Sequence, residues 1–211
     1  MRSVTDDHYF TADPMTPIER RPIVFSIGGH EHRLVAAGGV FSAGRLDLGT
    51  SVLLRKAPLP DATVGGPLLD LGCGYGPIAV VLAAAARTPV YAIDVNNRAL
   101  DLTRENAASA GLGELIMATT PDQVPPDVLF AQIWSNPPIR VGKQELHSML
   151  GTWLPRLAPG GVAWLVVSRN LGGDSLQRRL IDQGWEVLRH ASQKGYRVLK
   201  VTRREEPPAD S

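Results

Sequence analysis

Three polar residues, Asp70, Asp94 and Asn136, lie at the ends of separate apolar segments of the sequence. After Asp70 the chain enters a turn that contains Gly72 and Gly74. Glycine has no side chain and tolerates positive φ, so the backbone of such a turn can come close to a ligand. An acid roughly 20 residues further on, as at Asp94, holds the ribose hydroxyls in many nucleotide sites. This pattern predicts a nucleotide-like ligand.

The glycine spacing by itself leaves a second interpretation open. The run Gly72-x-Gly74-x-Gly76 is not the G-x-G-x-x-G of dinucleotide sites, because Pro77 occupies the last position. A tight turn between a strand and a helix, with no ligand, could have the same composition. Acids at two strand ends, Asp70 and Asp94, favour the ligand site.

The segment Asn136-Pro137-Pro138 predicts a different kind of chemistry. A residue that precedes proline is held out of the helical region, and proline has a fixed φ and no N–H. The loop therefore offers acceptors, namely the Asn136 side-chain carbonyl and the Pro137 main-chain carbonyl. These suit an amino group that donates two N–H bonds. Alone, the motif could be a rigid turn; the glycine loop and Asp94 favour the functional interpretation.

The elements that must position these residues alternate along the chain. The expected strands are residues 68–71, 90–93, 115–118, 128–134, 162–167, 185–189 and 196–202. The expected helices are residues 78–86, 97–110, 143–157 and 175–183. Pro159-Gly160-Gly161 is expected to end the third of these helices. Alternation of this kind predicts an α/β fold with a doubly wound, mostly parallel seven-stranded sheet. Ligands of such sheets bind beyond the carboxyl ends of the strands, where Asp70, Asp94 and Asn136 are expected.

An N-terminal section precedes this alternation. Residues 23–27 and 32–36 are expected to form a hairpin joined through Gly28-Gly29, and residues 51–56 a helix. We expect residues 1–60 to be an extension that caps the sheet, residues 61–204 to be the ligand-binding domain and residues 205–211 to be a tail.

Composition excludes few partners. The 211 residues carry a net charge of +1, which argues neither for nor against a polyanion. The one cysteine, Cys73, excludes an internal disulfide and suits a reducing compartment. No apolar run is long enough to cross a bilayer and the N-terminus lacks a signal peptide, so the cytoplasm is expected and a membrane partner is not. No metal site is predicted, and the oligomeric state is not defined.

These motifs together resemble those of class I S-adenosylmethionine-dependent methyltransferases. Residues 69–76 match the first motif of that class, Asp94 the second, and Asn136-Pro137-Pro138 the fourth motif of amino-directed enzymes. The segments 39–42, 46–50, 136–143 and 195–199 are similar to those of small-subunit ribosomal RNA guanine-N2 methyltransferases of the RsmC type. The resemblance implies a Rossmann-like fold and S-adenosylmethionine as cofactor. It also implies RNA methylation at guanine N2, with ribosomal RNA or a 30S particle as partner.

The resemblance assigns roles to the residues that would hold the cofactor. Gly72 and Gly74 would pass under its methionine part, and Asp70 would hold the turn or the cofactor ammonium. Asp94 would accept hydrogen bonds from both ribose hydroxyls, and Val95 would line the adenine. Asp122, which follows the third strand, would meet the adenine amino group.

Other roles concern the substrate side. Asp47 and Thr50 would close over the cofactor. Asn136 would also contact the cofactor and would orient the substrate amine. Ile139 stands where many amino methyltransferases have an aromatic residue that stacks on the base. Arg140 and Lys143 could meet phosphates, or could form a solvated helix end.

Two alternatives remain open from the sequence. The same acceptor loop would serve adenine or the amide of a protein glutamine. A non-catalytic module that binds the cofactor is a further alternative, against which the intact Asn136-Pro137-Pro138 argues. No histidine is needed as a base, because the proton can leave to water after transfer.

Overall fold

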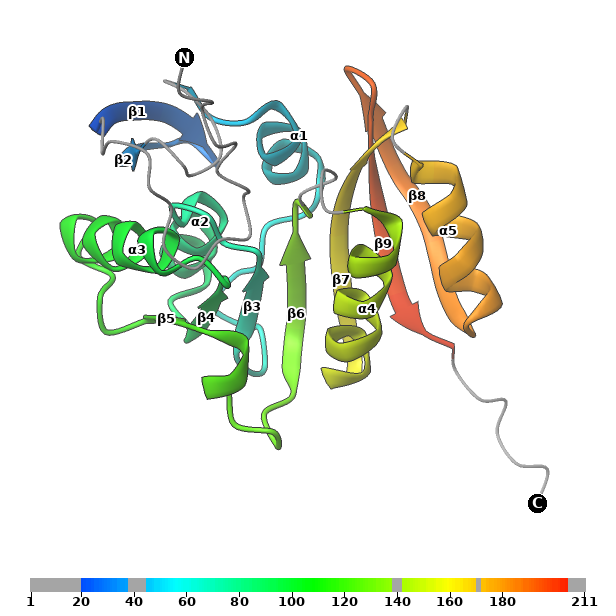
Figure 1. Ribbon diagram of the computed structural model, residues 1–211. Coiled ribbons are helices and arrows are strands. Elements are labelled where there is room, and N and C mark those ends of the chain that lie inside the picture. Colours follow the sequence, from blue (N-terminus) through cyan, green and yellow to red (C-terminus); the bar gives the residue numbers. More distant parts are fainter. Residues whose placement is uncertain (1–19, 38–44, 138–141, 170–171, 205–211) are drawn as a thin grey trace, which may run out of the picture.

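A seven-stranded sheet forms the centre of the computed structural model, which describes residues 20–37, 45–137, 142–169 and 172–204. In chain order its strands are β3 (Leu68–Leu71), β4 (Val90–Ile93), β5 (Ile116–Thr119), β6 (Phe130–Ser135), β7 (Leu157–Ser168), β8 (Trp185–Gln193) and β9 (Tyr196–Arg203). They lie in the order β5-β4-β3-β6-β7-β9-β8 (Figure 1). The first five run parallel, and β9 is antiparallel to both of its neighbours. The predicted mostly parallel sheet is confirmed.

The chain order reverses beside β3, whose neighbours are β4 on one side and β6 on the other. The carboxyl ends of adjacent parallel strands diverge at such a point, and the crevice between their loops is where sheets of this class bind ligands. The residues that follow β3, β4 and β6 are therefore brought to one edge.

Helices cover both faces of the sheet. One core contains side chains of α1 (Leu48–Lys56), α2 (Pro77–Ala86) and α3 (Asn97–Ser109). The other core contains side chains of α4 (Lys143–Trp153) and α5 (Gly173–Asp182). Successive residues of β3 alternate between the cores, Leu68 in the first and Leu69 in the second. All four residues of β3 are buried, as expected for a strand covered on two faces.

Local sequence determines where the helices begin. Asp47 caps α1 by accepting the Thr50 N–H at 2.9 Å, so α1 starts at Leu48, three residues before the predicted helix of residues 51–56. Asn96 caps α3 through the N–H groups of Arg98 and Ala99. Side-chain caps of this kind satisfy donors that the first helical turn leaves unpaired.

The expected third helix is shorter than predicted, and the strand after it longer. Helix α4 ends at Trp153, a 3₁₀ turn, η3 (Leu154–Arg156), follows, and β7 then begins before Pro159-Gly160-Gly161. The register with β6 shifts between Phe130 and Gln132, so the strand absorbs this segment as a bulge. At Gly161 a Cβ would lie 2.9–3.1 Å from three main-chain oxygens, which is why the strand has glycine there.

The predicted hairpin is confirmed as β1 (Arg20–Ile27) and β2 (His30–Ala37), which pair antiparallel. Gly28 and Gly29 have φ of 60° and 79°, as a two-residue hairpin turn requires. Hairpin side chains belong to the same core as α1, α2 and α3. Asn106 of α3 ties the hairpin down by accepting the Val35 N–H at 2.8 Å and donating to the Val35 carbonyl at 2.9 Å.

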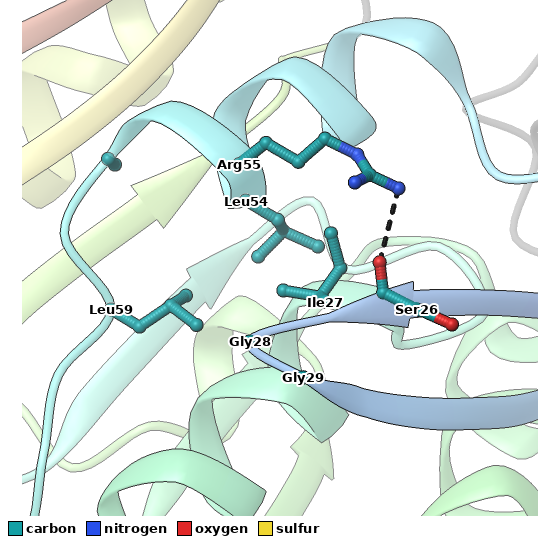
Figure 2. A pocket seen from close by; sticks show the side chains of 8 residues that line it. Ser26, Ile27, Gly28, Gly29, Leu54, Arg55 and Leu59 are labelled. Carbon is teal, nitrogen blue, oxygen red and sulfur yellow. Dashed lines mark hydrogen bonds between the residues drawn. The ribbon is translucent and has the colours of Figure 1, made fainter.

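A hollow of ≈ 520 Å³ lies between the hairpin turn and the end of α1, and Figure 2 draws the residues that line it. Arg55 crosses it and donates to the Ser26 main-chain oxygen at 3.1 Å. None of the predicted site residues lines it. The domain boundary at residue 60 stays a prediction, and residues 1–19 and 205–211 lie outside the described residues.

No helix in the described ranges is long and apolar enough to span a membrane.

Candidate active site

Asp70, Asp94 and Asn136 lie at the carboxyl ends of β3, β4 and β6, as predicted. Asp70 is the penultimate residue of β3, whereas Asp94 and Asn136 directly follow their strands. Because these three strands are neighbours in the sheet, the three residues lie along one edge of it. This edge is the candidate active site.

The glycine turn is held against the end of β4. Gly72 and Gly74 have φ of 78° and 58°, values that residues other than glycine rarely adopt. The N–H groups of Gly72 and Cys73 donate to the Ile93 carbonyl at 2.9 and 3.0 Å. The Gly74 N–H donates to Asp94 Oδ2 at 3.0 Å. The turn therefore presents a fixed main-chain surface beside the Asp94 carboxyl.

One side-chain oxygen of Asp70 is buried and has no hydrogen-bond partner among the described residues. Its Oδ2 accepts the Ala79 N–H of α2 at 2.9 Å, whereas Oδ1 is buried and unpaired. Burial raises the pKa of Asp70 to about 8, and the nearby charge of Asp94 adds to the rise. A cationic ligand group beside the turn would favour the ionised carboxylate and lower this pKa.

Asp94 is 5% exposed and accepts one main-chain N–H on each oxygen, from Asn96 and from Gly74. Burial raises the pKa of Asp94, while these N–H groups oppose the rise. An ionised carboxylate has about four acceptor positions, so both oxygens can still accept hydroxyls. Val95 beside it is 41% exposed, an apolar surface at the rim.

Asn136 is oriented by two residues of the α1 start. Its Nδ2 donates to Asp47 Oδ1 at 2.6 Å and to Thr50 Oγ1 at 2.9 Å. A carboxylate only accepts, so the amide nitrogen and not the amide oxygen must face Asp47. Among the described residues no donor reaches Asn136 Oδ1. The structure thus leaves this oxygen free as an acceptor.

Tyr196 and Gly49 border the same oxygen, and neither was predicted as a site residue. A Cβ at Gly49 would lie 2.9 Å from Tyr196 Cε1, 3.0 Å from Asn136 Oδ1 and 3.1 Å from Asp47 Oδ1. Burial, with the charge of Asp47, raises the pKa of Tyr196. Tyr196 begins β9 opposite Ser168, at the carboxyl end of β7. The Gly-Tyr pair after the last turn was the only sequence signal for this aromatic side chain.

Other predicted residues are less closely involved. Asp122 is exposed in the 3₁₀ turn η1 (Pro121–Gln123) after β5 and hydrogen-bonds to none of the other described site residues. Lys143 is exposed as the first residue of α4. Pro138, Ile139 and Arg140 lie outside the described residues, as does the segment 39–42.

The site offers acceptors and main-chain groups but no activated nucleophile in its described part. Cys73 is buried beside Thr103, and burial raises the pKa of its thiol. The described residues hold no group of three His, Cys, Asp or Glu that could bind a metal ion. The arrangement instead suits a bound cation and an incoming amine.

A doubly wound sheet with this glycine turn, an acid after β4 and Asn136-Pro137 after β6 defines a class I S-adenosylmethionine-dependent methyltransferase. The family model described as the methyltransferase small domain matches residues 31–200. The chain belongs to this family.

The chain is similar in sequence to an uncharacterised bacterial protein and to ribosomal RNA methyltransferases. "Uncharacterized protein YbxB" of Bacillus subtilis (strain 168) is 31% identical over 198 residues, which cover 92% of this chain and 98% of the relative. A "Ribosomal RNA small subunit methyltransferase C" of Pseudomonas putida is 34% identical over 206 residues, covering 95% of this chain and 59% of the relative. That of Aeromonas hydrophila is 37% identical over 134 residues, 61% of this chain and 36% of the relative. The chain therefore spans about three fifths or less of these ribosomal RNA methyltransferases.

Solved structures of methyltransferases have the same fold as this chain. The T. thermophilus 16S rRNA N2 methyltransferase (RsmC), in complex with AdoMet and guanosine, superimposes with a TM-score of 0.69 at 25% identity. The match covers 90% of this chain and 52% of that one. A ribosomal protein L11 methylase from Lactobacillus delbrueckii, at 18% identity and a TM-score of 0.59, shares the fold alone.

The described residues fit S-adenosylmethionine, the cofactor of this class. Asp70 Oδ1 is a buried carboxyl oxygen without a partner, which suits a positively charged ligand. The absence of a Cβ at Gly49 lets the side chains of Tyr196, Asn136 and Asp47 come together at the start of α1.

Proposed function

We propose that this protein transfers a methyl group from S-adenosylmethionine to an exocyclic amino group, namely guanine N2 of small-subunit ribosomal RNA. The observation that carries the proposal is Asn136 Oδ1, which accepts no hydrogen bond from the described residues while Asp47 and Thr50 fix the orientation of its amide. The relatives named for small-subunit ribosomal RNA, and the fold match to a 16S rRNA N2 methyltransferase, support this substrate. The reaction would take place where ribosomal subunits are assembled, in the cytoplasm.

The cofactor supplies a methyl group already activated by a sulfonium. The protein's part is to bind it with the turn of Gly72 and Gly74, to balance its charge with Asp70, and to hold its ribose with Asp94. Val95 would lie against the adenine and Asp122 would meet the adenine amino group. Asp47 and Thr50 would reach the cofactor from the α1 side while they hold Asn136.

The substrate nitrogen needs preparation, because its lone pair is delocalised into the base. Asn136 Oδ1 and the Pro137 carbonyl would accept its two N–H groups, which favours a pyramidal nitrogen whose lone pair points at the methyl carbon. These oxygens also stabilise the positive charge that grows on nitrogen during transfer. The proton would leave to water afterwards. Pro138, which like Pro137 has a fixed φ and no N–H, would limit the freedom of this loop.

The target base would lie between the Asn136 loop and Tyr196. A base paired inside a helix cannot reach this edge, so the target nucleotide would be splayed out of its stack. Stacking on an aromatic ring contributes about 1–3 kcal/mol per base, and Tyr196 would supply a ring that position 139 does not. Ile139 would cover the other face of the base, while Arg140 would contact the flanking strand.

Adenine or a protein glutamine amide is the alternative substrate, because both offer an NH₂ group to the same two acceptors. Incubation of the protein with labelled S-adenosylmethionine and undermethylated 30S subunits, followed by separation of RNA and protein, distinguishes them. We expect label in the RNA, as N2-methylguanosine. Label confined to ribosomal protein, or found as methyladenosine, would contradict the proposed substrate.

The role of Asn136 is tested in the same assay. Asn136→Ala removes an acceptor that acts mainly in the transition state, so we expect a fall in kcat of about 10²-fold or more. Its affinity for S-adenosylmethionine, measured by calorimetry, should change far less than kcat. Glu114→Ala, at an exposed position before β5, is the control. An Asn136→Ala protein that transfers methyl groups at the parent rate would refute the mechanism.

A further inference from the structure

A second hollow lies between α4 and α5, away from the cofactor residues. It has a volume of ≈ 490 Å³ and is lined by Lys143, Gln144, His147, Ser148 and Arg179. The two helices lie side by side on one face of the sheet (Figure 1) and share a core. Every residue of the lining can donate a hydrogen bond, and none is an acid.

The positive charges of this hollow are not compensated. Lys143 and Arg179 are exposed, and their side chains form no ion pair or hydrogen bond with the described residues. Asp174, the acid in the first turn of α5, is paired with Arg189 and Arg197 of the sheet. Glu145 and Asp182, on the same helices, do not line the hollow.

The pKa of His147 is sensitive to the positive charges of Lys143 and Arg179 in this hollow. Partial burial lowers the pKa of His147, and the charges of Arg179 and Lys143 lower it further. Cations that converge without an acid destabilise one another. Lys143 also stands at the N-terminal end of α4, where the helix dipole disfavours a positive charge. A bound anion would relieve both effects.

The hollow adjoins the substrate side of the active site. Lys143 begins the helix that follows the Asn136 loop, and its Cε lies 3.5 Å from the Cβ position of Gly172, next to the start of α5. Helices α4 and α5 follow β6 and β7 respectively, so both begin at the edge of the sheet that carries Asn136.

We propose that the hollow of Lys143, His147 and Arg179 binds a phosphodiester group of the RNA strand that flanks the target nucleotide. This inference rests on the proposed function, since it needs RNA as the substrate. Phosphate suits the lining because a guanidinium can bind two of its oxygens at once, while an ammonium neutralises it as a point charge. The contact would hold the strand in register while the target base enters beside Asn136.

Arg179→Gln and Lys143→Gln test the inference against Arg178→Gln. Arg178 is exposed and adjacent on α5 but does not line the hollow, so it is a matched control. Binding of an unmodified 16S rRNA transcript is measured at several salt concentrations. We expect each hollow variant to bind roughly threefold to tenfold more weakly, with a salt slope reduced by about 0.7–0.9. The control should match the parent, and all variants should keep the parent's melting temperature and cofactor affinity.

Three outcomes would overturn the inference: unchanged salt slopes, equal effects of Arg178→Gln and Arg179→Gln, or loss of binding to 30S subunits without loss of binding to the transcript. In each case a parent protein that still methylates ribosomal RNA leaves the proposed function standing. If the parent neither binds nor methylates the RNA, the proposed function fails as well.

Discussion

At the scale of single residues, the orientation of one amide determines what the site can accept. Asp47 accepts both the Thr50 N–H, as a helix cap, and the Asn136 amide, as an orienting partner. These two roles can be separated. Serine caps helices about as well as aspartate, but its shorter side chain does not reach Asn136.

We therefore expect Asp47→Ser to lower kcat roughly tenfold, a transition-state effect of about 1.4 kcal/mol, with little change in melting temperature. The measurement is a kcat and KM determination beside thermal unfolding. Thr50→Ser, which keeps the hydroxyl that Asn136 contacts, should retain more activity. A stable Asp47→Ser protein with parental kcat would mean that Asn136 needs no orientation by Asp47.

Asp70 gives the protein a pH-dependent stability. Its pKa in the folded state is about 8, above the ordinary value of 3.8, so the folded protein binds the proton more tightly than the unfolded chain. The free energy of unfolding should therefore fall as pH rises from about 4 to about 8, and level off above that. Asp70→Asn should make this dependence shallower; urea unfolding at several pH values measures it. An equally steep dependence in the variant would place its source elsewhere, for example at Asp94.

At the scale of elements, the active site depends on the contact between the α1 start and β9. Gly49 leaves the space in which Tyr196, Asn136 and Asp47 converge. In Gly49→Ala the added methyl would displace the ends of these side chains, which can move, so the fold should persist while kcat falls about tenfold or more. Gly151→Ala is the control, because its Cβ on α4 would meet nothing within 4 Å. It should gain up to about 1 kcal/mol of stability and keep full activity. Equal kcat values for the two variants would contradict the role of this contact.

The arrangement of strands and helices also explains which site residues could be predicted from the sequence. Asp70, Asp94 and Asn136 were predictable because strand periodicity locates strand ends, and parallel strands bring those ends together. Tyr196 was not, because its place beside Asn136 follows from the packing of α1 against β9, which no local pattern reports. The β7 bulge was missed for a similar reason. Pro159-Gly160-Gly161 is typical of a helix end, and only the pairing with β6 makes it part of a strand.

At the scale of the whole molecule, the hairpin and the sheet share one core. Asn106 is 1% exposed and joins α3 to Val35 of the hairpin and to the Tyr75 carbonyl. Unfolding should therefore be one cooperative transition, and Asn106→Ala should lower its free energy by about 2–4 kcal/mol because several buried groups lose their partners. Circular dichroism and tryptophan fluorescence should report coincident urea transitions. Two separate transitions in the parent would show that the N-terminal extension folds as an independent unit.

The most direct test of the account is a crystal structure of the protein with S-adenosylmethionine bound. The account predicts the sulfonium near Asp70, the ribose hydroxyls on Asp94, and the methyl carbon facing the space beside Asn136 Oδ1 and the Pro137 carbonyl. A methyl carbon directed away from these two oxygens, or a cofactor bound elsewhere, would contradict it.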